Sequence, residues 1–313
     1  MILAAIDIGT NTVLLLVARL ESAGNIEPLA YEQRIPRLGK GVDSEKNLHP
    51  EAMRRVVDVL VEYKAICKAH NTERVIVCAT SAVRDAHNRD EFLALVRKAT
   101  GFEVEVLSGE EEAYWTYRGA ISGIPGIQRA TVVDIGGGST EITVGTARDI
   151  AYARSLNIGS VRLTERYFRH DPPTDAELEI AIAHTENQLA GIDASKLAHT
   201  TLIGVAGTVT TLALLAQRKN NFAVEAVTNY RLPTEKVRDL FRMLRAMSVR
   251  EIRQLSPVLE GRSDVILAGT LILREIMEHF NFPEVIVSER GVRYGLILRE
   301  WERAKLRHAG MET

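Results

Sequence analysis

The chain has 313 residues, of which 46% are hydrophobic and 26% charged, and its formal net charge at pH 7 is −2. This composition is typical of a soluble globular protein, and the length allows two domains. The near-neutral charge gives no general attraction to nucleic acid, and the apolar runs are too short to span a bilayer. We therefore expect neither a nucleic-acid nor a membrane partner.

The two cysteines, Cys67 and Cys78, are too far apart in sequence to form a closely spaced pair. This spacing argues against a disulfide framework or a zinc site and favours a reducing compartment. The first residues carry no basic segment ahead of their apolar run, so they predict a strand rather than a signal peptide. These features predict a cytoplasmic protein.

The first part of the chain predicts strands followed by alternating helices and strands. Two apolar runs separated by Gly-Thr-Asn-Thr predict a β-hairpin over 2–20, and 27–35 supplies a third strand. Pro50 begins a helix to about residue 70, since proline is favoured at the first helical position. The remaining predicted elements are a strand at 74–79, a helix at 89–100, a strand at 103–107 and a helix from Ser108 to about 121.

The same order of elements begins again after the linker Gly123–Gly126. Strands flank a glycine-rich turn, a third strand follows, and a capping box from Thr174 to Glu177 begins the next helix. The predicted strands of this part are 131–135, 141–145, 150–157, 201–205 and 284–288, and its predicted helices are 174–190, one after residue 205, 234–247, 249–255, 262–280 and one from 293.

One motif occurs twice, as Asp-Ile-Gly-Thr-Asn-Thr at 7–12 and as Asp-Ile-Gly-Gly-Gly-Ser-Thr-Glu at 134–141. The three glycines of the second copy allow backbone N–H groups to approach an anion closely. Asp134 and Glu141 add two carboxylates beside this phosphate cradle, a donor set that suits Mg²⁺. An ordinary glycine hairpin would explain either copy alone, but the repetition favours phosphate binding.

Three further segments carry polar groups that suit a phosphate site. Gly207 and Thr208 begin a helix, whose first N–H groups can bind an anion, although simple capping by Thr208 explains them equally well. Arg84 follows a buried strand, and a guanidinium matches phosphate with two parallel bonds. Glu112 lies beyond the capping box Ser108–Glu111, so its carboxylate is available to activate water, although the helix dipole alone explains acidic residues in this first turn.

The motifs occur in the order found in the exopolyphosphatase/guanosine pentaphosphate phosphohydrolase family, which the chain resembles from Ile2 to about Arg299. The runs that carry this resemblance are IDIGTNTVLLLVA, ATSAVRDA, LSGEEEA, VVDIGGGSTEI, GVAGTVTTLA, GRSDVILAG and VSERGVRYGLIL. The resemblance implies an α/β fold of two duplicated ribonuclease-H-like domains, of the actin, sugar kinase and Hsp70 type, flanking a central cleft. The domains expected are 1–123 and 124–292, with the final helix, about 293–310, packed on the first. The chain resembles a short member without the C-terminal HD-like domain.

The resemblance also implies a role for each candidate residue. Glu112 matches the catalytic base, and the metal ligands implied are Asp134, Glu141 and Asp7. The phosphate-binding residues implied are Gly136, Gly137, Gly138, Ser139, Asn11, Thr12, Arg84, Gly207 and Thr208. The expected cofactor is Mg²⁺, with Mn²⁺ as a substitute, and the expected assembly is a homodimer.

These features predict an exopolyphosphatase, which hydrolyses the terminal phosphoanhydride of inorganic polyphosphate and releases orthophosphate. The motifs fit equally the removal of the 5′-phosphate of guanosine pentaphosphate (pppGpp), which ends in the same anhydride. Arg238, Arg242 and Arg245 fall on neighbouring helical turns and indicate a solvated face or part of a path for a long polyanion. The more remote alternatives are an ATPase or kinase of the same fold and a non-enzymatic, actin-like assembly protein.

Overall fold

The computed structural model describes residues 1–21 and 25–308. The chain forms two compact units: unit 1 comprises Met1–Gly119 and Arg290–Thr313, and unit 2 comprises Ala120–Glu289. The boundary falls inside helix α5 (Gly109–Ile121), ahead of the expected Gly123, because this helix continues past the end of unit 1. Positions 309–310 of the expected final helix lie outside the described residues. No helix in the described part is long and apolar enough to cross a membrane.

Unit 1 is built on a five-stranded sheet in the order β3-β2-β1-β4-β5. The strands β1, β2 and β3 are antiparallel, and β4 and β5 run parallel to β1. The predicted hairpin and third strand are therefore confirmed. Their bounds are β1 (Ile2–Ile8), β2 (Val13–Leu20), β3 (Ile26–Arg34), β4 (Arg74–Ala79) and β5 (Val104–Val106).

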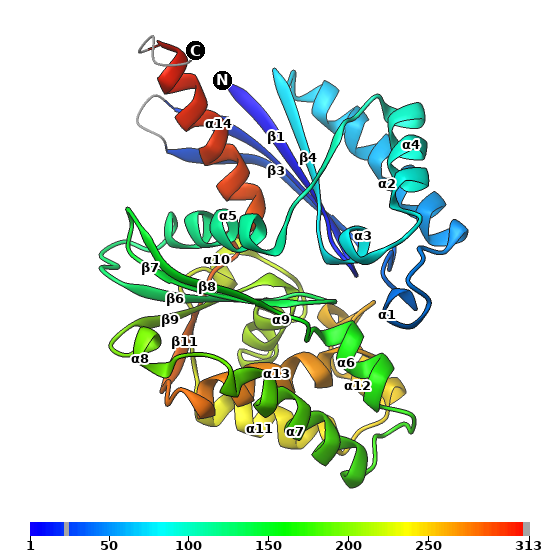
Figure 1. Ribbon diagram of the computed structural model, residues 1–313, viewed down its shortest axis with the longest axis vertical. Coiled ribbons are helices and arrows are strands. Elements are labelled where there is room, and N and C mark those ends of the chain that lie inside the picture. Colours follow the sequence, from blue (N-terminus) through cyan, green and yellow to red (C-terminus); the bar gives the residue numbers. More distant parts are fainter. Residues whose placement is uncertain (22–24, 309–313) are drawn as a thin grey trace. The chain divides into compact units, whose positions relative to one another are not determined.

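Helices cover both faces of this sheet, and the alternation of side chains along β1 decides what each face buries. Ala4, Ile6 and Ile8 pack in one hydrophobic cluster with α2 (Pro50–Ala69) and α4 (Arg89–Thr100). Leu3 and Ala5 face the other way and pack with α14 (Val292–His308), the last helix of the chain (Figure 1). Asp7 continues this second series, so its side chain lies on the α14 face.

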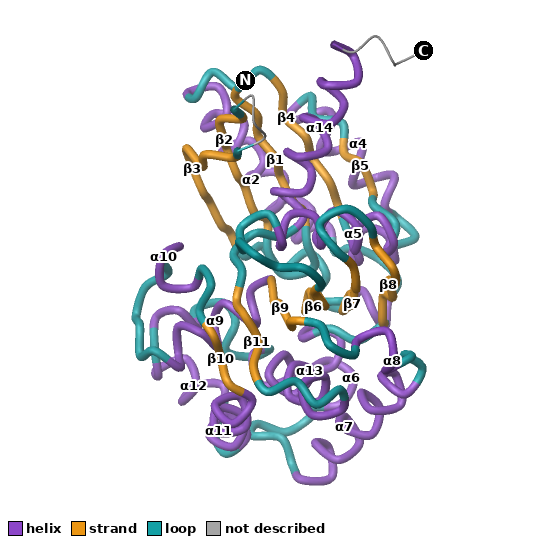
Figure 2. The backbone as a smooth tube through the Cα atoms, turned by 90° about the vertical axis from the view of Figure 1, so that its left-hand side faces the viewer, coloured by secondary structure: helices purple, strands orange, loops and turns teal. Residues whose placement is uncertain are grey.

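Unit 2 contains a six-stranded sheet in the order β10-β11-β9-β6-β7-β8. Read from β8 to β11, it repeats the strand order and directions of unit 1, and β10 is an added antiparallel edge. Figure 2 shows the strands of both sheets in orange. This repetition confirms the duplicated α/β fold. The bounds are β6 (Ala130–Ile135), β7 (Thr140–Gly145), β8 (Ile150–Leu156), β9 (Thr201–Val205), β10 (Arg231–Pro233) and β11 (Glu284–Val287).

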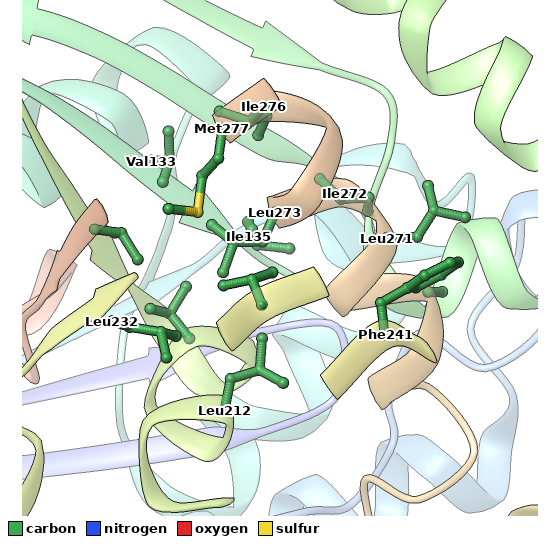
Figure 3. Packing of buried hydrophobic residues seen from close by; sticks show 14 of the residues in the cluster. Val133, Ile135, Leu212, Leu232, Phe241, Leu271, Ile272, Leu273, Ile276 and Met277 are labelled. Carbon is green, nitrogen blue, oxygen red and sulfur yellow. The ribbon is translucent and has the colours of Figure 1, made fainter. Parts of the chain in front are cut away.

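The core of unit 2 lies between its sheet and its longer helices. Val133 and Ile135 of β6 pack with Leu212, Leu273 and Met277 of the helices (Figure 3). The helices are α6 (Ser160–Tyr167), α7 (Asp175–Ala190), α9 (Ala206–Ala216), α11 (Thr234–Arg245), α12 (Val249–Leu255) and α13 (Ile266–His279). The capping box predicted at the start of α7 is confirmed.

Several short elements were not expected from the sequence. They comprise α1 (Val42–Glu45), α3 (Ser81–Asp85), α8 (Ala194–Leu197), α10 (Val224–Val227) and the 3-10 turn Pro257–Leu259, in addition to α6 and β10. Of these, α3 and α6 matter for the site, because each lies next to one of the polar segments described below.

Candidate functional site

The two copies of the repeated motif fold into turns of the same geometry. In unit 1, Ile8 pairs with Val13, and the N–H of Gly9 donates to the carbonyl of Thr12 at 2.9 Å. In unit 2, Ile135 pairs with Thr140, and the N–H of Gly136 donates to the carbonyl of Ser139 at 3.0 Å. Residues 9–12 therefore correspond one to one with residues 136–139.

In the glycine-rich turn, helix α6 holds the carbonyl groups. The carbonyl of Gly136 accepts from the N–H of Ser160, that of Gly137 from the N–H groups of Val161 and Arg162, and that of Gly138 from Nε of Arg162 at 2.6 Å. Within the described part of the chain, the N–H groups of Gly137 and Gly138 donate to no protein acceptor. These two N–H groups are therefore available to donate to an anion, the role that the motif predicts for them.

The first turn is anchored in the same way by the segment 37–39. The N–H of Gly39 donates to the carbonyl of Thr10 at 2.8 Å, and the N–H of Arg37 donates to that of Asn11 at 3.1 Å. Asn11 is buried and Thr12 half-buried. Each unit thus fixes the carbonyls at the middle of its own turn through a neighbouring backbone segment.

The acids beside the two turns differ. Asp134 and Glu141 lie directly opposite each other on β6 and β7, so their side chains share one face of the sheet. In unit 1 the residue opposite Asp7 is Leu14, so the first hairpin lacks the second carboxylate. Glu141 is 2% exposed, and its Oε1 accepts a hydrogen bond from Oγ of Ser155 at 2.7 Å.

The donor chemistry of this pair fits Mg²⁺. Among the described residues, no group of three or more His, Cys, Asp or Glu side chains is placed to hold a metal ion. Mg²⁺ commonly binds one or two carboxylates and completes its shell with phosphate oxygens and water. Asp134 and Glu141 would therefore suit a metal that binds together with a phosphorylated substrate, and not a closed structural site.

The start of α9 forms a second candidate anion site in unit 2. Asp134 is in register with Val205, so this helix begins next to the acidic pair. Ala206 has the left-handed φ of 69°, a value that is uncommon for a residue other than glycine. A Cβ on Gly207 would overlap the guanidinium of Arg262, so this cation lies directly against the glycine. Thr208 is buried, and the N-cap residue of the helix is Val205, whose side chain makes no capping hydrogen bond.

Glu112 and Arg84 are brought together in unit 1. Nη1 of Arg84 donates to Oε2 of Glu112 and to the carbonyl of Leu107, both at 2.9 Å. Glu112 is 8% exposed. Burial raises the pKa of Glu112, and the charge and hydrogen bonds of Arg84 oppose that rise. Arg84, expected to bind phosphate, therefore contacts the candidate base directly. The predicted capping box is also present, because Ser108 and Glu111 exchange hydrogen bonds.

Asp7 lies in a buried network on the α14 face of unit 1. Burial raises the pKa of Asp7 to about 7, the neighbouring Glu112 adds to the rise, and Arg293 and a hydrogen bond from Cys78 oppose it. The Sγ of Cys78 lies 3.9 Å from Oδ1 of Asp7. Arg293 is 3% exposed and donates to the carbonyl of Leu15 and the hydroxyl of Tyr31.

We expect the free energy of unfolding of Asp7→Asn to increase relative to that of the wild type as the pH rises from 4 to 8. The folded protein holds a proton on Asp7 up to about pH 7, whereas the unfolded chain loses it near the ordinary pKa of 3.8. The wild type therefore loses stability across this interval, and asparagine removes the loss. Urea unfolding in EDTA at several pH values measures the difference, with the exposed Asp149→Asn as control. Parallel curves for wild type and Asp7→Asn would contradict the assignment.

Three arginines that the motifs did not assign lie beside the candidate residues. Arg262 and Arg293 fall in GRSDVILAG and VSERGVRYGLIL, runs whose order carries the family resemblance without indicating a role for either side chain. Arg162 falls in a helix that the sequence did not predict. The predicted site residues fall into two sets: Asp7, Asn11, Thr12, Arg84 and Glu112 in unit 1, and Asp134, Gly136, Gly137, Gly138, Ser139, Glu141, Gly207 and Thr208 in unit 2.

Several known proteins are similar to this chain over nearly its whole length. Exopolyphosphatase 2 of Mycobacterium tuberculosis is 36% identical over 94% of this chain and 97% of that protein. A guanosine-5′-triphosphate,3′-diphosphate pyrophosphatase of Photobacterium profundum is 33% identical over 97% of this chain and 60% of that protein. The crystal structure of the Aquifex aeolicus Ppx/GppA family member has a TM-score of 0.83 at 32% identity, covering 97% of this chain and 98% of that one.

A second solved structure agrees with the first. An exopolyphosphatase from Cytophaga hutchinsonii has a TM-score of 0.89 at 27% identity, again over 97% of this chain and 98% of that one. The expected fold is thus confirmed over nearly the whole chain. The sequence model described as the Ppx/GppA phosphatase family matches residues 16–304. The chain therefore belongs to the Ppx/GppA phosphatase family, as its motifs predict.

Proposed function

We propose that this phosphatase is an exopolyphosphatase, which uses Mg²⁺ to remove the terminal phosphoryl group of inorganic polyphosphate as orthophosphate. The observation that supports this most is the pair Asp134 and Glu141 beside a turn whose three glycine carbonyls are bonded to α6. Such a turn offers N–H donors without competing carbonyl oxygens. Fixed donors and metal-binding acids are the groups that stabilise charge on a phosphoryl group in transfer.

In this mechanism the groups of unit 2 bind the substrate. The N–H groups of Gly137 and Gly138 donate to oxygens of the terminal phosphoryl group, and Asp134 and Glu141 would hold the metal. When bound, Mg²⁺ would withdraw negative charge from those oxygens. The start of α9, with the guanidinium of Arg262 against Gly207, binds a further phosphate of the chain.

The groups of unit 1 supply the base. Glu112 takes a proton from a water molecule, which attacks the terminal phosphorus, while the anhydride P–O bond breaks and the shortened chain leaves. Burial makes Glu112 a stronger base than an exposed carboxylate, and Arg84 holds its orientation. Asp7, Asn11 and Thr12 contribute further contacts to the phosphates and metal.

The choice of polyphosphate over pppGpp is supported by the relatives and not by the basic residues of α11. The chain spans 97% of the relative named as an exopolyphosphatase but 60% of the one named as a pyrophosphatase. Arg238 pairs with Glu278, and Arg242 and Arg245 also pair with acids. Because these arginines are paired with acids, they favour a solvated face on α11 over a path for a long polyanion. The arginines of α11 therefore give no reason to exclude pppGpp, which stays the second candidate substrate.

We expect the purified protein to release orthophosphate from long-chain polyphosphate with a kcat/KM at least about 10-fold above that for pppGpp, a difference of roughly 1.4 kcal/mol. EDTA should stop the release from both, and added Mg²⁺ should restore it. The opposite ranking would assign the protein to pppGpp hydrolysis. Turnover of ATP with no release from either substrate would place it with the ATPases and kinases of the same fold.

A further inference from the structure

Two glycines inside helices bring the backbones of α5 and α14 into contact within unit 1. A Cβ on Gly295 would lie 2.9 Å from the Cα of Trp115 and closer still to its carbonyl group. A Cβ on Gly119 would lie 2.9 Å from the amide nitrogen of Gly295 and closer still to the carbonyl oxygen of Gly291. Figure 1 shows α14 crossing α5 at this place. Any side chain at either position would force the two helices apart.

Helix propensity does not explain why glycine occupies these two positions. Gly119 lies inside α5 and Gly295 inside α14, where glycine is among the least favourable residues for helix formation. Alanine would favour both helices by propensity alone. The close approach of the two backbones is therefore the physical reason for glycine at each position.

Further contacts tie the same stretch of α5 to α14. Arg118 of α5 pairs with Glu302 of α14 at 2.6 Å. The guanidinium of Arg299 on α14 lies 5.8 Å from the ring centre of Trp115 and binds both carboxylate oxygens of Glu105, at 2.8 and 2.7 Å. Arg299 is buried. The helix α14 thus fixes α5 along the turns that follow Glu112.

We propose that Gly119 and Gly295 are positioning residues, which place the carboxylate of Glu112 by setting how closely α5 packs on α14. The inference rests on the proposed role of Glu112 as the base. Because a short helix moves almost as a rigid rod, a shift of about 1 Å that admits a Cβ would displace Glu112 by a similar distance. A displacement of about 1 Å can lower a rate by about 10²-fold.

The test compares Gly295→Ala and Gly119→Ala with Gly291→Ala, a matched control whose Cβ would meet no atom within 4 Å. We expect kcat for phosphate release to fall at least about 10-fold in the first two variants, while KM changes less than about 2-fold. The control should keep the wild-type kcat. Circular dichroism and cooperative urea unfolding establish that each variant is folded.

Glu112→Gln, measured alongside, separates this inference from the proposed function. Wild-type kcat in both alanine variants, with Glu112→Gln inactive, would overturn the inference and leave the function intact. A raised KM at unchanged kcat would overturn it as well, because the effect would then lie in binding. Full activity of Glu112→Gln would instead remove the base and with it the role of the glycines.

A second variant keeps the test decisive if the alanine variants do not fold. Arg118→Met removes the ion pair with Glu302 at the same crossing without a clash. We expect kcat to fall about threefold at unchanged KM. The effect is smaller than in the alanine variants because loss of the ion pair loosens the contact between the helices without forcing them apart. An unchanged kcat in this variant would overturn the inference.

Discussion

Glu112→Gln should lower kcat for phosphate release by about 10³-fold and leave the affinity for substrate within about 3-fold of the wild type. Glutamine has nearly the same shape and still accepts a hydrogen bond from Arg84, but it cannot take a proton from water. The base is already buried and paired, so the substitution changes its chemistry more than its packing. Initial rates with polyphosphate, and binding measured by calorimetry, check the two halves of this expectation.

Glu111→Gln is the matched control for this variant. Glu111 is the preceding residue, is exposed, and exchanges hydrogen bonds with Ser108 at the start of the same helix. Glutamine also completes a capping box, so both the helix and the activity should persist. A loss of activity in both variants would point to disturbance of the helix start. Full activity in Glu112→Gln would show that another group activates the water.

Asp7 is a half-buried carboxylate near Glu112, and the structure gives the two acids different surroundings. Arg84 donates directly to Glu112 and favours its ionised form. Among the described residues, Asp7 accepts a hydrogen bond only from the weak thiol donor of Cys78, and its pKa is raised to about 7. The hydrogen bond from Arg84 also fixes the orientation of the Glu112 carboxylate, which a general base requires. This difference favours Glu112 as the base.

The sequence predicts the fold well because the strands and long helices bury continuous apolar patterns. The bounds of β1, β2 and β4 agree with the predicted strands, since alternating or continuous apolar residues define them. The short helix α6 was missed because its first turn is held by the carbonyls of the glycine turn, and not by a capping residue of its own. Contacts of that kind depend on tertiary structure and leave no local pattern.

The same limit applies to the candidate site. The repeated motif predicts the two turns and the acids beside them, because these residues are close in sequence. The contact between Arg84 and Glu112 joins residues far apart in the chain, so the sequence indicates two polar residues but not that one holds the other. Arg293 reaches the first hairpin from the last helix, and no local pattern distinguishes it from other helical arginines.

At about 1 mM Mg²⁺, Asp134→Asn should lower kcat by at least about 10²-fold. This fall corresponds to several kcal/mol of lost charge stabilisation. An amide keeps the size of the carboxylate but removes the charge that would attract the metal. Glu141→Gln should have a smaller effect on Mg²⁺ affinity, because Ser155 already donates to one oxygen of Glu141. Activity titrated with Mg²⁺ measures both, and higher concentrations should partly restore each variant.

The asymmetry between the two hairpins makes this expectation specific to unit 2. Asp7→Asn alters the equivalent position of unit 1, where Leu14 replaces the opposing acid. If Asp134 on β6 and Glu141 on β7 together hold the metal, Asp134→Asn must raise the Mg²⁺ concentration needed for half-maximal activity. This rise must be larger than the rise caused by Asp7→Asn. An equal rise in the two variants would mean that both hairpins bind the metal to the same degree. A normal Mg²⁺ requirement in Asp134→Asn would remove this residue from the metal site, because one carboxylate of a two-carboxylate set cannot be lost without weaker binding.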